Sequence, residues 1–185
     1  MTNRFLATIR LVLDAARRGG FRVALIGGFA LPFHGIRRAT GDVDFLVEAG
    51  GADALDGDLL AAGFRRLHRS DDSANYAASC PDYAAVDLLL ARRAPSLDML
   101  ARADRHRMAQ DGLEVPVVDV EGIIGLKVQA IANDPRRRRR DAEDIVTLLA
   151  AHPEGLDLPL LEHYFELFEM RDELTALLEE ARTRR

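Results

Sequence analysis

Two short segments early in the chain carry residue types that can bind a metal ion and phosphate. The first is LIGGFA at residues 25–30, in which a glycine pair follows an apolar run, and the second is DVDF at residues 42–45. Successive side chains of a β-strand point to opposite faces, so Asp42 and Asp44 would project together. Two parallel carboxylates suit Mg²⁺, which binds through one or two carboxylates and completes its shell with waters and substrate phosphates.

A third carboxylate, Asp87, lies in the otherwise apolar segment AVDLLL at residues 85–90. A buried charge is costly unless it is paired or binds a metal ion, so Asp87 needs a partner. If its strand lies beside the strand of the acidic pair, the three carboxylates can hold two Mg²⁺ ions about 3.5–4 Å apart, as in phosphoryl-transfer sites. Gly27 and Gly28 would then let backbone N–H groups approach phosphates at a helix N-terminus.

Three further motifs lie before and after these acids. Arg38 and Thr40 precede the acidic pair, Lys127 lies in GLKVQA at residues 125–130, and RDAED occupies residues 140–144. The glycine pair, the acidic pair after a short gap and the later lone acid resemble the signature of the polymerase-beta-like nucleotidyltransferase superfamily. With the further motifs, the sequence is similar to the branch that contains the abortive-infection (AbiEii-like) nucleotidyltransferase toxins.

The resemblance implies a magnesium-dependent enzyme that moves a nucleoside monophosphate from an NTP to a hydroxyl. It implies an RNA end such as tRNA, or a protein hydroxyl, as acceptor and an antitoxin protein as partner. Two alternatives stay open: a small-molecule acceptor, as in antibiotic-modifying relatives, and a noncatalytic protein that keeps the fold and binds nucleotide, RNA or a partner. The residues implied are Asp42, Asp44 and Asp87 for metal binding and catalysis, with Asp87 as general base, and Gly27, Gly28, Arg38, Thr40 and Lys127 for the triphosphate.

One departure from the superfamily pattern concerns phosphate binding. Members that carry Gly-Ser can place the serine hydroxyl on a phosphate, whereas Gly28 leaves only backbone donors. We therefore expect weaker phosphate binding and a poorer match to the antibiotic-modifying members with Gly-Ser.

Lys127 lies on an otherwise apolar face of a predicted helix. On a helix over residues 120–132 it shares a face with positions 120, 123, 124, 128 and 131, which are all apolar. A lysine on a buried stripe needs an anion, and a nucleotide phosphate, an internal pair with Asp141 or Asp144, or snorkelling to the surface would each serve. For the two aspartates, the sequence favours structural pairing.

Charge and composition narrow the class of protein. The 185 residues carry a formal charge of −5, so any contact with nucleic acid must be local. The one local surplus is the arginine run at 136–140, which fits equally a solvated turn and a contact with triphosphate or RNA. The apolar content of 48% is ordinary for a soluble protein, and nothing reads as a secretory signal or a membrane span, so we expect a cytoplasmic protein.

The spacing of apolar residues predicts an α+β fold in which helices flank a small mixed sheet of four to five strands, the nucleotidyltransferase fold, followed by a C-terminal helical segment. Strands are expected over residues 21–26, 42–48, 64–69, 74–80 and 83–91. Helices are expected over residues 5–19, 29–35, 55–63, 120–132, 136–151, 158–168 and 174–178. Residues 92–113 show helical spacing around residues 97–101 and no clear alternation afterwards, so no element is assigned there. We expect a catalytic core over 1–118 and a helical region over 119–185 that packs on it as a single compact unit.

Overall fold

The computed structural model describes residues 3–109 and 111–184. The chain divides into two compact units. The first runs to Phe33 and continues over Arg37–Val118, and the second holds His34–Ile36 and the chain from Asp119 onward.

The first unit is built on a mixed sheet with the strand order β3-β4-β5-β2-β1-β7-β6. β1 is antiparallel to β2 and parallel to β7, and β2 is parallel to β5, so the centre of the sheet is mixed. The outer pairs β3–β4, β4–β5 and β6–β7 are antiparallel. The strands are β1 (Val23–Ile26), β2 (Asp42–Glu48), β3 (Phe64–Arg69), β4 (Ser73–Ala78), β5 (Ala85–Ala91), β6 (Asp104–Arg107) and β7 (Glu114–Val117).

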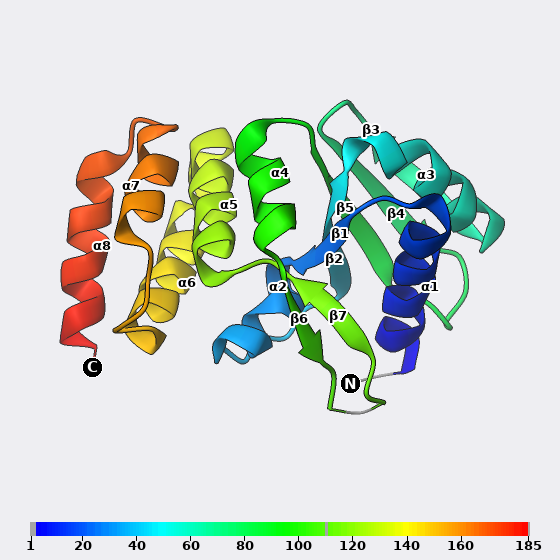
Figure 1. Ribbon diagram of the computed structural model, residues 1–185, viewed down its shortest axis with the longest axis horizontal. Helices are drawn as coiled ribbons and strands as arrows, with labels where there is room; N and C mark the ends of the chain where they lie inside the picture. The colour runs from blue at the N-terminus through cyan, green and yellow to red at the C-terminus, as the bar shows by residue number, and fades with distance from the viewer. Residues whose placement is uncertain (1–2, 110, 185) are drawn as a thin grey trace. The chain divides into compact units, whose positions relative to one another are not determined.

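Helices cover this sheet. Figure 1 shows α1 and α3 on one side of it and α4 on the other. The apolar stripe of α1 is buried, and the helix stops before Gly20, whose φ of +67° lies in the left-handed region that glycine tolerates. The helical segments are α1 (Asn3–Gly19), α2 (Gly27–Ala30), the 3₁₀ turns η1 (Leu31–His34) and η2 (Ala49–Gly51), α3 (Ala52–Ala61) and α4 (Ala94–Arg102).

The second unit is helical. α5 (Val120–Asn133) packs on α6 (Arg138–Ala151) and α7 (Leu158–Glu166), and α8 (Arg171–Thr183) packs on α6 and α7. The 3₁₀ turn η3 (Pro135–Arg137) joins α5 to α6. Asp119 caps α5 by accepting a hydrogen bond from the Gly122 N–H at 2.8 Å, as expected for an aspartate at this position.

The α+β class with a mixed sheet is confirmed, but the expected strand number is wrong. Seven strands pair in the described residues, two of them in or just after the segment that showed no clear alternation. β6 consists of Asp104, Arg105, His106 and Arg107, so it has no apolar alternation. It forms because the next strand, β7, pairs with it along its whole length, and pairing with another strand leaves no signal within the four residues themselves.

Two helices also differ from expectation. Residues 29–35 were predicted as one short helix, whereas the structure has α2 from Gly27 followed by η1, with Pro32 in the 3₁₀ turn. The last helix begins at Arg171, before the predicted residues 174–178. Its first three residues are polar, so the spacing of apolar residues did not reveal this start. No helix in the described ranges combines the length and apolar character needed to cross a bilayer.

Candidate active site

Three carboxylates converge at the centre of the sheet. Asp42 and Asp44 lie on β2 with Val43 fully buried between them, which is the alternation expected of a half-buried strand. The parallel register of β2 and β5 pairs Asp44 with Asp87. One carboxylate oxygen from each aspartate lies within 4.8 Å of the other two, and all three residues are half-buried. This cluster is the geometry that the sequence predicted for a divalent cation.

Thr40 supports the first of these acids. Its hydroxyl donates to Oδ1 of Asp42 at 2.7 Å and lies 3.3 Å from the Asp42 carbonyl oxygen. The Thr40 side chain also lies where a side chain at position 28 would begin: a Cβ on Gly28 would be 2.7 Å from Thr40 Cβ and 2.9 Å from Oγ1. Gly28 is therefore required by the packing of Thr40.

Gly27 supports the second acid in a similar way. Its φ of +60° lies in the left-handed region, and a Cβ there would be 2.1 Å from Oδ2 of Asp44. β1 and β2 pair Ile26 with Asp44, so the chain turns into α2 directly beside that carboxylate. The glycine pair thus makes room for the acidic cluster, a structural reason that sequence reasoning did not supply.

Asp87 has a neighbour that sequence reasoning missed. Asn75 on β4 donates from Nδ2 to Oδ1 of Asp87 at 2.6 Å, across the register that pairs the two residues. This hydrogen bond fixes one oxygen of Asp87 and leaves Oδ2 for another partner. The signal in the sequence was the alternation of β4, but nothing local indicates which β5 residue Asn75 faces.

Arg38 lies on the segment that leads into β2. It is half-buried and lines a pocket together with Gly28 and Thr40. The structure therefore brings Arg38, the glycine pair, Thr40 and the three aspartates into one region of the first unit.

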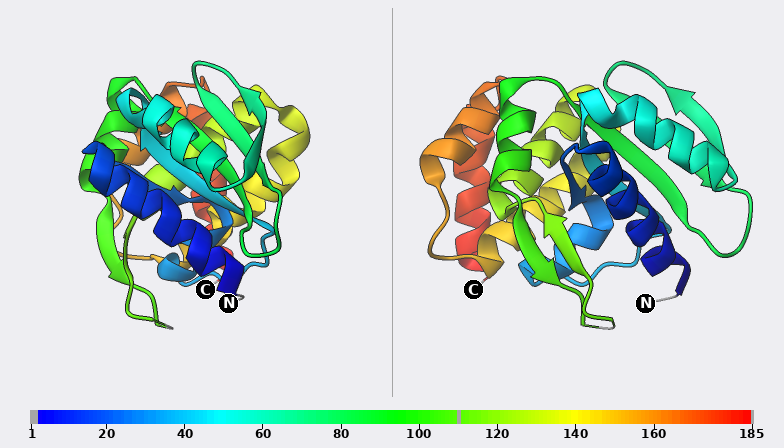
Figure 2. Two further views of the ribbon diagram at one scale, coloured as in Figure 1. Left: turned by 90° about the vertical axis from the view of Figure 1, so that its right-hand side faces the viewer. Right: turned by 45° about the vertical axis from the view of Figure 1, so that its right-hand side comes forward.

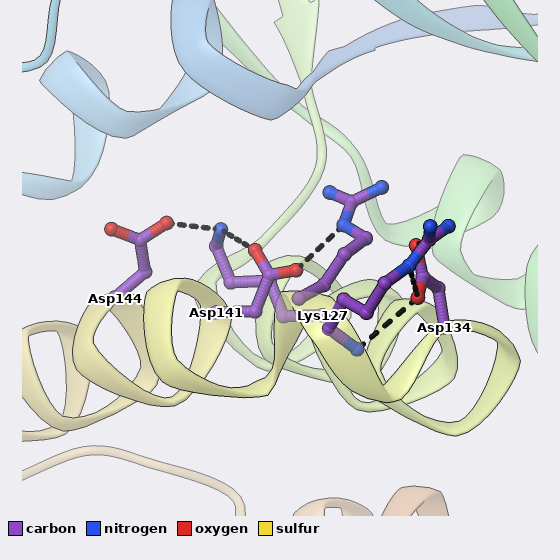
Figure 3. A network of polar contacts seen from close by, with 6 residues as sticks. Lys127, Asp134, Asp141 and Asp144 are labelled. Carbon is purple, nitrogen blue, oxygen red and sulfur yellow. Dashed lines mark hydrogen bonds and ion pairs between the residues drawn. The ribbon is translucent and has the colours of Figure 1, made fainter.

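Lys127 belongs to the second unit, where it forms an ion-pair network (Figure 3). Its Nζ lies 2.5 Å from Oδ2 of Asp144 and 3.2 Å from Oδ1 of Asp141. The Lys127 side chain is 13% exposed, and that of Asp141 is 1% exposed. Arg137 donates from Nε to the second oxygen of Asp141 at 2.9 Å. The internal pair that the sequence left open as an alternative is present, with both aspartates taking part.

The arginine run is largely balanced by acids of the second unit. Arg136 pairs with Asp134 at 2.8 Å, and this contact lowers the pKa of the Asp134 carboxyl. Arg137 pairs with Asp141, and Arg138 pairs with Glu173 at 2.5 Å. All five arginines of residues 136–140 are exposed. These pairs favour the charged turn over a dedicated anion site, and an anion contact of Arg139 or Arg140 stays a prediction.

A mixed sheet with three converging acids, glycines beside them and a helical unit after them defines the nucleotidyltransferase class. The model of the family described as "Nucleotidyl transferase AbiEii toxin, Type IV TA system" matches residues 12–185. The chain belongs to this family of nucleotidyltransferases, as its motifs predicted. No curated protein matches the sequence.

Solved structures share the fold at low sequence identity. The antibiotic-resistance factor ANT(2'')-Ia matches with a TM-score of 0.63 and 19% identity over 97% of each chain. An antigenic nucleotidyltransferase-like protein from Paracoccidioides brasiliensis matches with a TM-score of 0.59 and 20% identity over 97% of this chain and 94% of that one. The lincosamide antibiotic adenylyltransferase LnuA matches with a TM-score of 0.53 and 13% identity, covering 80% and 98%. At these identities the likeness concerns the fold.

Proposed function

We propose that the protein transfers a nucleoside monophosphate from an NTP to a hydroxyl of an RNA or protein acceptor, with Mg²⁺ bound by Asp42, Asp44 and Asp87. The observation that carries the proposal is the convergence of these three carboxylates, whose oxygens lie within 4.8 Å of one another.

The donor set fits magnesium. All three candidate ligands are carboxylate oxygens, which suit a hard cation and leave positions for waters and phosphate oxygens. Thr40 and Asn75 orient Asp42 and Asp87 through hydrogen bonds, as supporting residues around metal ligands do. Bound there, two Mg²⁺ ions would neutralise triphosphate charge and polarise the attacking and leaving oxygens.

The protein residues would then take the following roles. Gly27, Gly28, Arg38 and Thr40 contact the triphosphate and hold its α-phosphorus beside the acidic cluster. Asp87 accepts the proton of the acceptor hydroxyl on Oδ2, since Oδ1 already accepts from Asn75. The acceptor oxygen forms a bond to the α-phosphorus, and the bond from that phosphorus to the bridging oxygen breaks. Pyrophosphate leaves with the bonding electrons.

Lys127 is proposed to contact the triphosphate as well. Its ammonium has three N–H donors, of which Asp141 and Asp144 take two. The third donor remains for a phosphate oxygen. The aspartates would thereby orient the ammonium in addition to compensating its charge.

The family supports a role as the toxin of a toxin–antitoxin pair, with an antitoxin protein as partner. A small-molecule acceptor has weaker support, because the likeness to ANT(2'')-Ia and LnuA is one of fold.

The test is incubation of the protein with each α-labelled NTP, Mg²⁺ and either total tRNA or candidate small molecules, with Asp44→Asn as the matched variant. We expect label on RNA or on protein, lost in the variant and lost when EDTA is added. Label on a small molecule alone would overturn the proposed acceptor. Tight NTP binding with no labelled product in any mixture would overturn the enzymatic function.

A further inference from the structure

The first unit contains a pocket of about 500 Å³ beside the candidate active site. It opens between the N-terminal part of α1, the α2–η1 segment, residues 38–40 and the β6–β7 hairpin, which runs beside α2 (Figure 2). Its size falls within the range of small-molecule sites. Its lining residues include Phe5, Gly28, Phe29, Phe33, Arg38, Thr40, Arg107 and Met108.

Aromatic rings form much of the wall. Phe5 and Phe29 are buried, with ring centroids 4.8 Å apart, so they are held firmly by each other. Phe33 is half-buried, and one side of its ring contacts His106 at a centroid distance of 5.1 Å. A partly exposed ring beside an open pocket can stack on a planar group, and base–aromatic stacking accepts any nucleobase.

The charged residues that line the pocket are basic, so they favour an anionic ligand. Arg38 and Arg107 line it, and none of its described lining residues is acidic. Arg4 does not line the pocket, but its guanidinium carbon lies 4.8 Å from the ring centroid of Phe5, which does, so a third cation is close by. These cations gather on a protein whose net charge is −5. A polycationic acceptor would be repelled here, whereas a nucleotide offers both a planar ring and phosphates.

The pocket is continuous with the acidic cluster. Gly28 and Thr40 belong to its wall, and Thr40 donates to Asp42. A nucleotide seated in the pocket would therefore present its ribose beside the proposed metal ligands. Gly28, Arg38 and Thr40 line the pocket and are also proposed triphosphate contacts, so the pocket adjoins the donor site. Arg4 and Arg107 come from α1 and β6, elements that supply none of the proposed triphosphate contacts, so they suit the phosphodiester chain of a second nucleotide substrate.

We infer that this pocket seats the terminal base of the RNA acceptor, stacked on Phe33, with the adjoining phosphates on Arg4 and Arg107. The inference rests on the proposed function and specifies how the protein recognises its RNA acceptor.

Binding to a short single-stranded RNA that ends in 2-aminopurine tests the pocket without any turnover. Stacking on a phenylalanine ring quenches this fluorophore, so we expect quenching by the wild-type protein. Phe33→Leu removes the ring while keeping an apolar side chain, and Arg107→Gln removes one cation. Each should weaken RNA binding by about fivefold or more. The matched control is Arg65→Gln, an exposed arginine on β3 outside the pocket, which should bind as the wild type does.

A parallel arm uses 2-aminopurine riboside triphosphate. Quenching of this nucleotide and not of the RNA would show that the pocket holds the donor base, which overturns the inference. Equal RNA binding by all four proteins would overturn it too, as would binding of a cationic aminoglycoside that Arg107→Gln strengthens. These outcomes are separate from failure of the proposed function, because the RNA assay needs no catalysis. Conversely, Phe33→Leu and Arg107→Gln could both transfer nucleotide to RNA with an unchanged KM for RNA. This result would support the proposed function but show that the pocket does not bind the RNA.

Discussion

Gly28 and Thr40 together explain the departure from the Gly-Ser pattern. A Cβ at position 28 would lie within 3.0 Å of three side-chain atoms of Thr40, so the threonine occupies the space that a serine at 28 would need. The Thr40 hydroxyl thus lies beside the glycine pair, but its hydrogen is donated to Asp42. The expectations that only backbone donors remain at position 28 and that phosphate binding is weaker both stay predictions.

A double-mutant cycle tests the steric coupling between positions 28 and 40. Gly28→Ser should reduce nucleotide transfer by about 100-fold, because it displaces Thr40 and with it Asp42 by a fraction of an ångström. Adding Thr40→Ala makes room for the new side chain and should restore part of the activity, so the two changes are not additive. Steady-state rates of transfer give the measurement. Gly57→Ser is the control, since a Cβ there meets nothing within 4 Å. If the effects of the two changes were strictly additive, positions 28 and 40 would not be coupled.

The three carboxylates repel one another when no cation is bound. Asp44→Asn should therefore raise the melting temperature in EDTA, because it removes one of three like charges within 4.8 Å. In the wild type, Mg²⁺ at about 100 times its Kd should add about 2.7 kcal/mol of stability, and the variant should lose most of this gain. Calorimetric melts with and without Mg²⁺ measure both effects. Asp98→Asn on α4 is the control, and an equal magnesium shift in Asp44→Asn would remove Asp44 from the site.

At the residue scale, the sequence identified what local patterns can encode. Asp42 and Asp44 follow from period-two alternation, and Asp87 from an acid in an apolar strand. Asn75 escaped because its contact with Asp87 depends on the register between two strands, which no single segment specifies. The same limit applies to Lys127: its stripe revealed the need for an anion, but the choice among partners required the packing of α5 on α6.

At the scale of elements, an ion pair joins the start of β1 to the end of β2, the strand that carries the acids. Arg22 donates from its backbone N–H and Nε to Oε2 of Glu48 at 3.1 Å, and from Nη2 to Oε1 at 3.1 Å. The Glu48 N–H donates to the Arg22 carbonyl at 2.9 Å. The Arg22 guanidinium lowers the pKa of the Glu48 carboxyl below its ordinary 4.5.

This lowered pKa makes the contribution of the pair dependent on pH. Stability from Glu48 is present above its unfolded-state pKa and is lost as the pH falls through the lower folded-state value. Glu48→Gln should therefore destabilise the protein at pH 7 by at most about 1 kcal/mol, because the pair is partly exposed. Urea unfolding of both proteins between pH 7 and pH 3 measures the difference. It should be constant down to about pH 5 and shrink below it, and a difference that grows on acidification would have the wrong sign.

The Lys127 network ties α5 to α6. Lys127→Met keeps the length of the side chain but leaves the almost fully buried Asp141 and the neighbouring Asp144 without the ammonium, so it should destabilise the protein by about 3 kcal/mol. Urea unfolding gives this value, and the exposed Arg139→Gln provides a control expected to change stability by less than about 0.5 kcal/mol. If NTP affinity also falls under conditions where the variant is fully folded, the third donor of Lys127 is used as proposed. Unchanged NTP affinity would limit Lys127 to a structural role.

Helices and long strands of the fold were predictable because their apolar spacing repeats several times. β3 was predicted to the residue, and β2 likewise, whereas β6 and β7 have four residues each and were missed. β6 depends on its antiparallel partner for its conformation, and its polar sequence suits an edge strand that contacts water. β3, at the other edge, is longer and contains Phe64 and Leu67, whereas β6 has no apolar residue. For a short edge strand of this kind, pairing with its neighbour, and not local pattern, decides the structure.

At the scale of the whole molecule, the net charge of −5 limits how RNA can bind. Nonspecific attraction to nucleic acid scales with the number of phosphates that arginine and lysine neutralise. If Arg4 and Arg107 each contact one phosphate, the slope of log K against log salt for a single strand should be about −1.4, and Arg107→Gln should reduce it by about 0.7.

Fluorescence anisotropy with a labelled single-stranded RNA between 50 and 300 mM KCl measures this slope, and duplex DNA of the same length should bind far more weakly. A slope steeper than about −3 would mean that at least four phosphates are neutralised, beyond what the pocket offers. The exposed Arg139 and Arg140 would then be the first residues to substitute, because they are the part of the arginine run without an acidic partner in the described second unit. A shallow slope confines recognition to the pocket, so affinity must come chiefly from the stacked base and change only modestly with its identity.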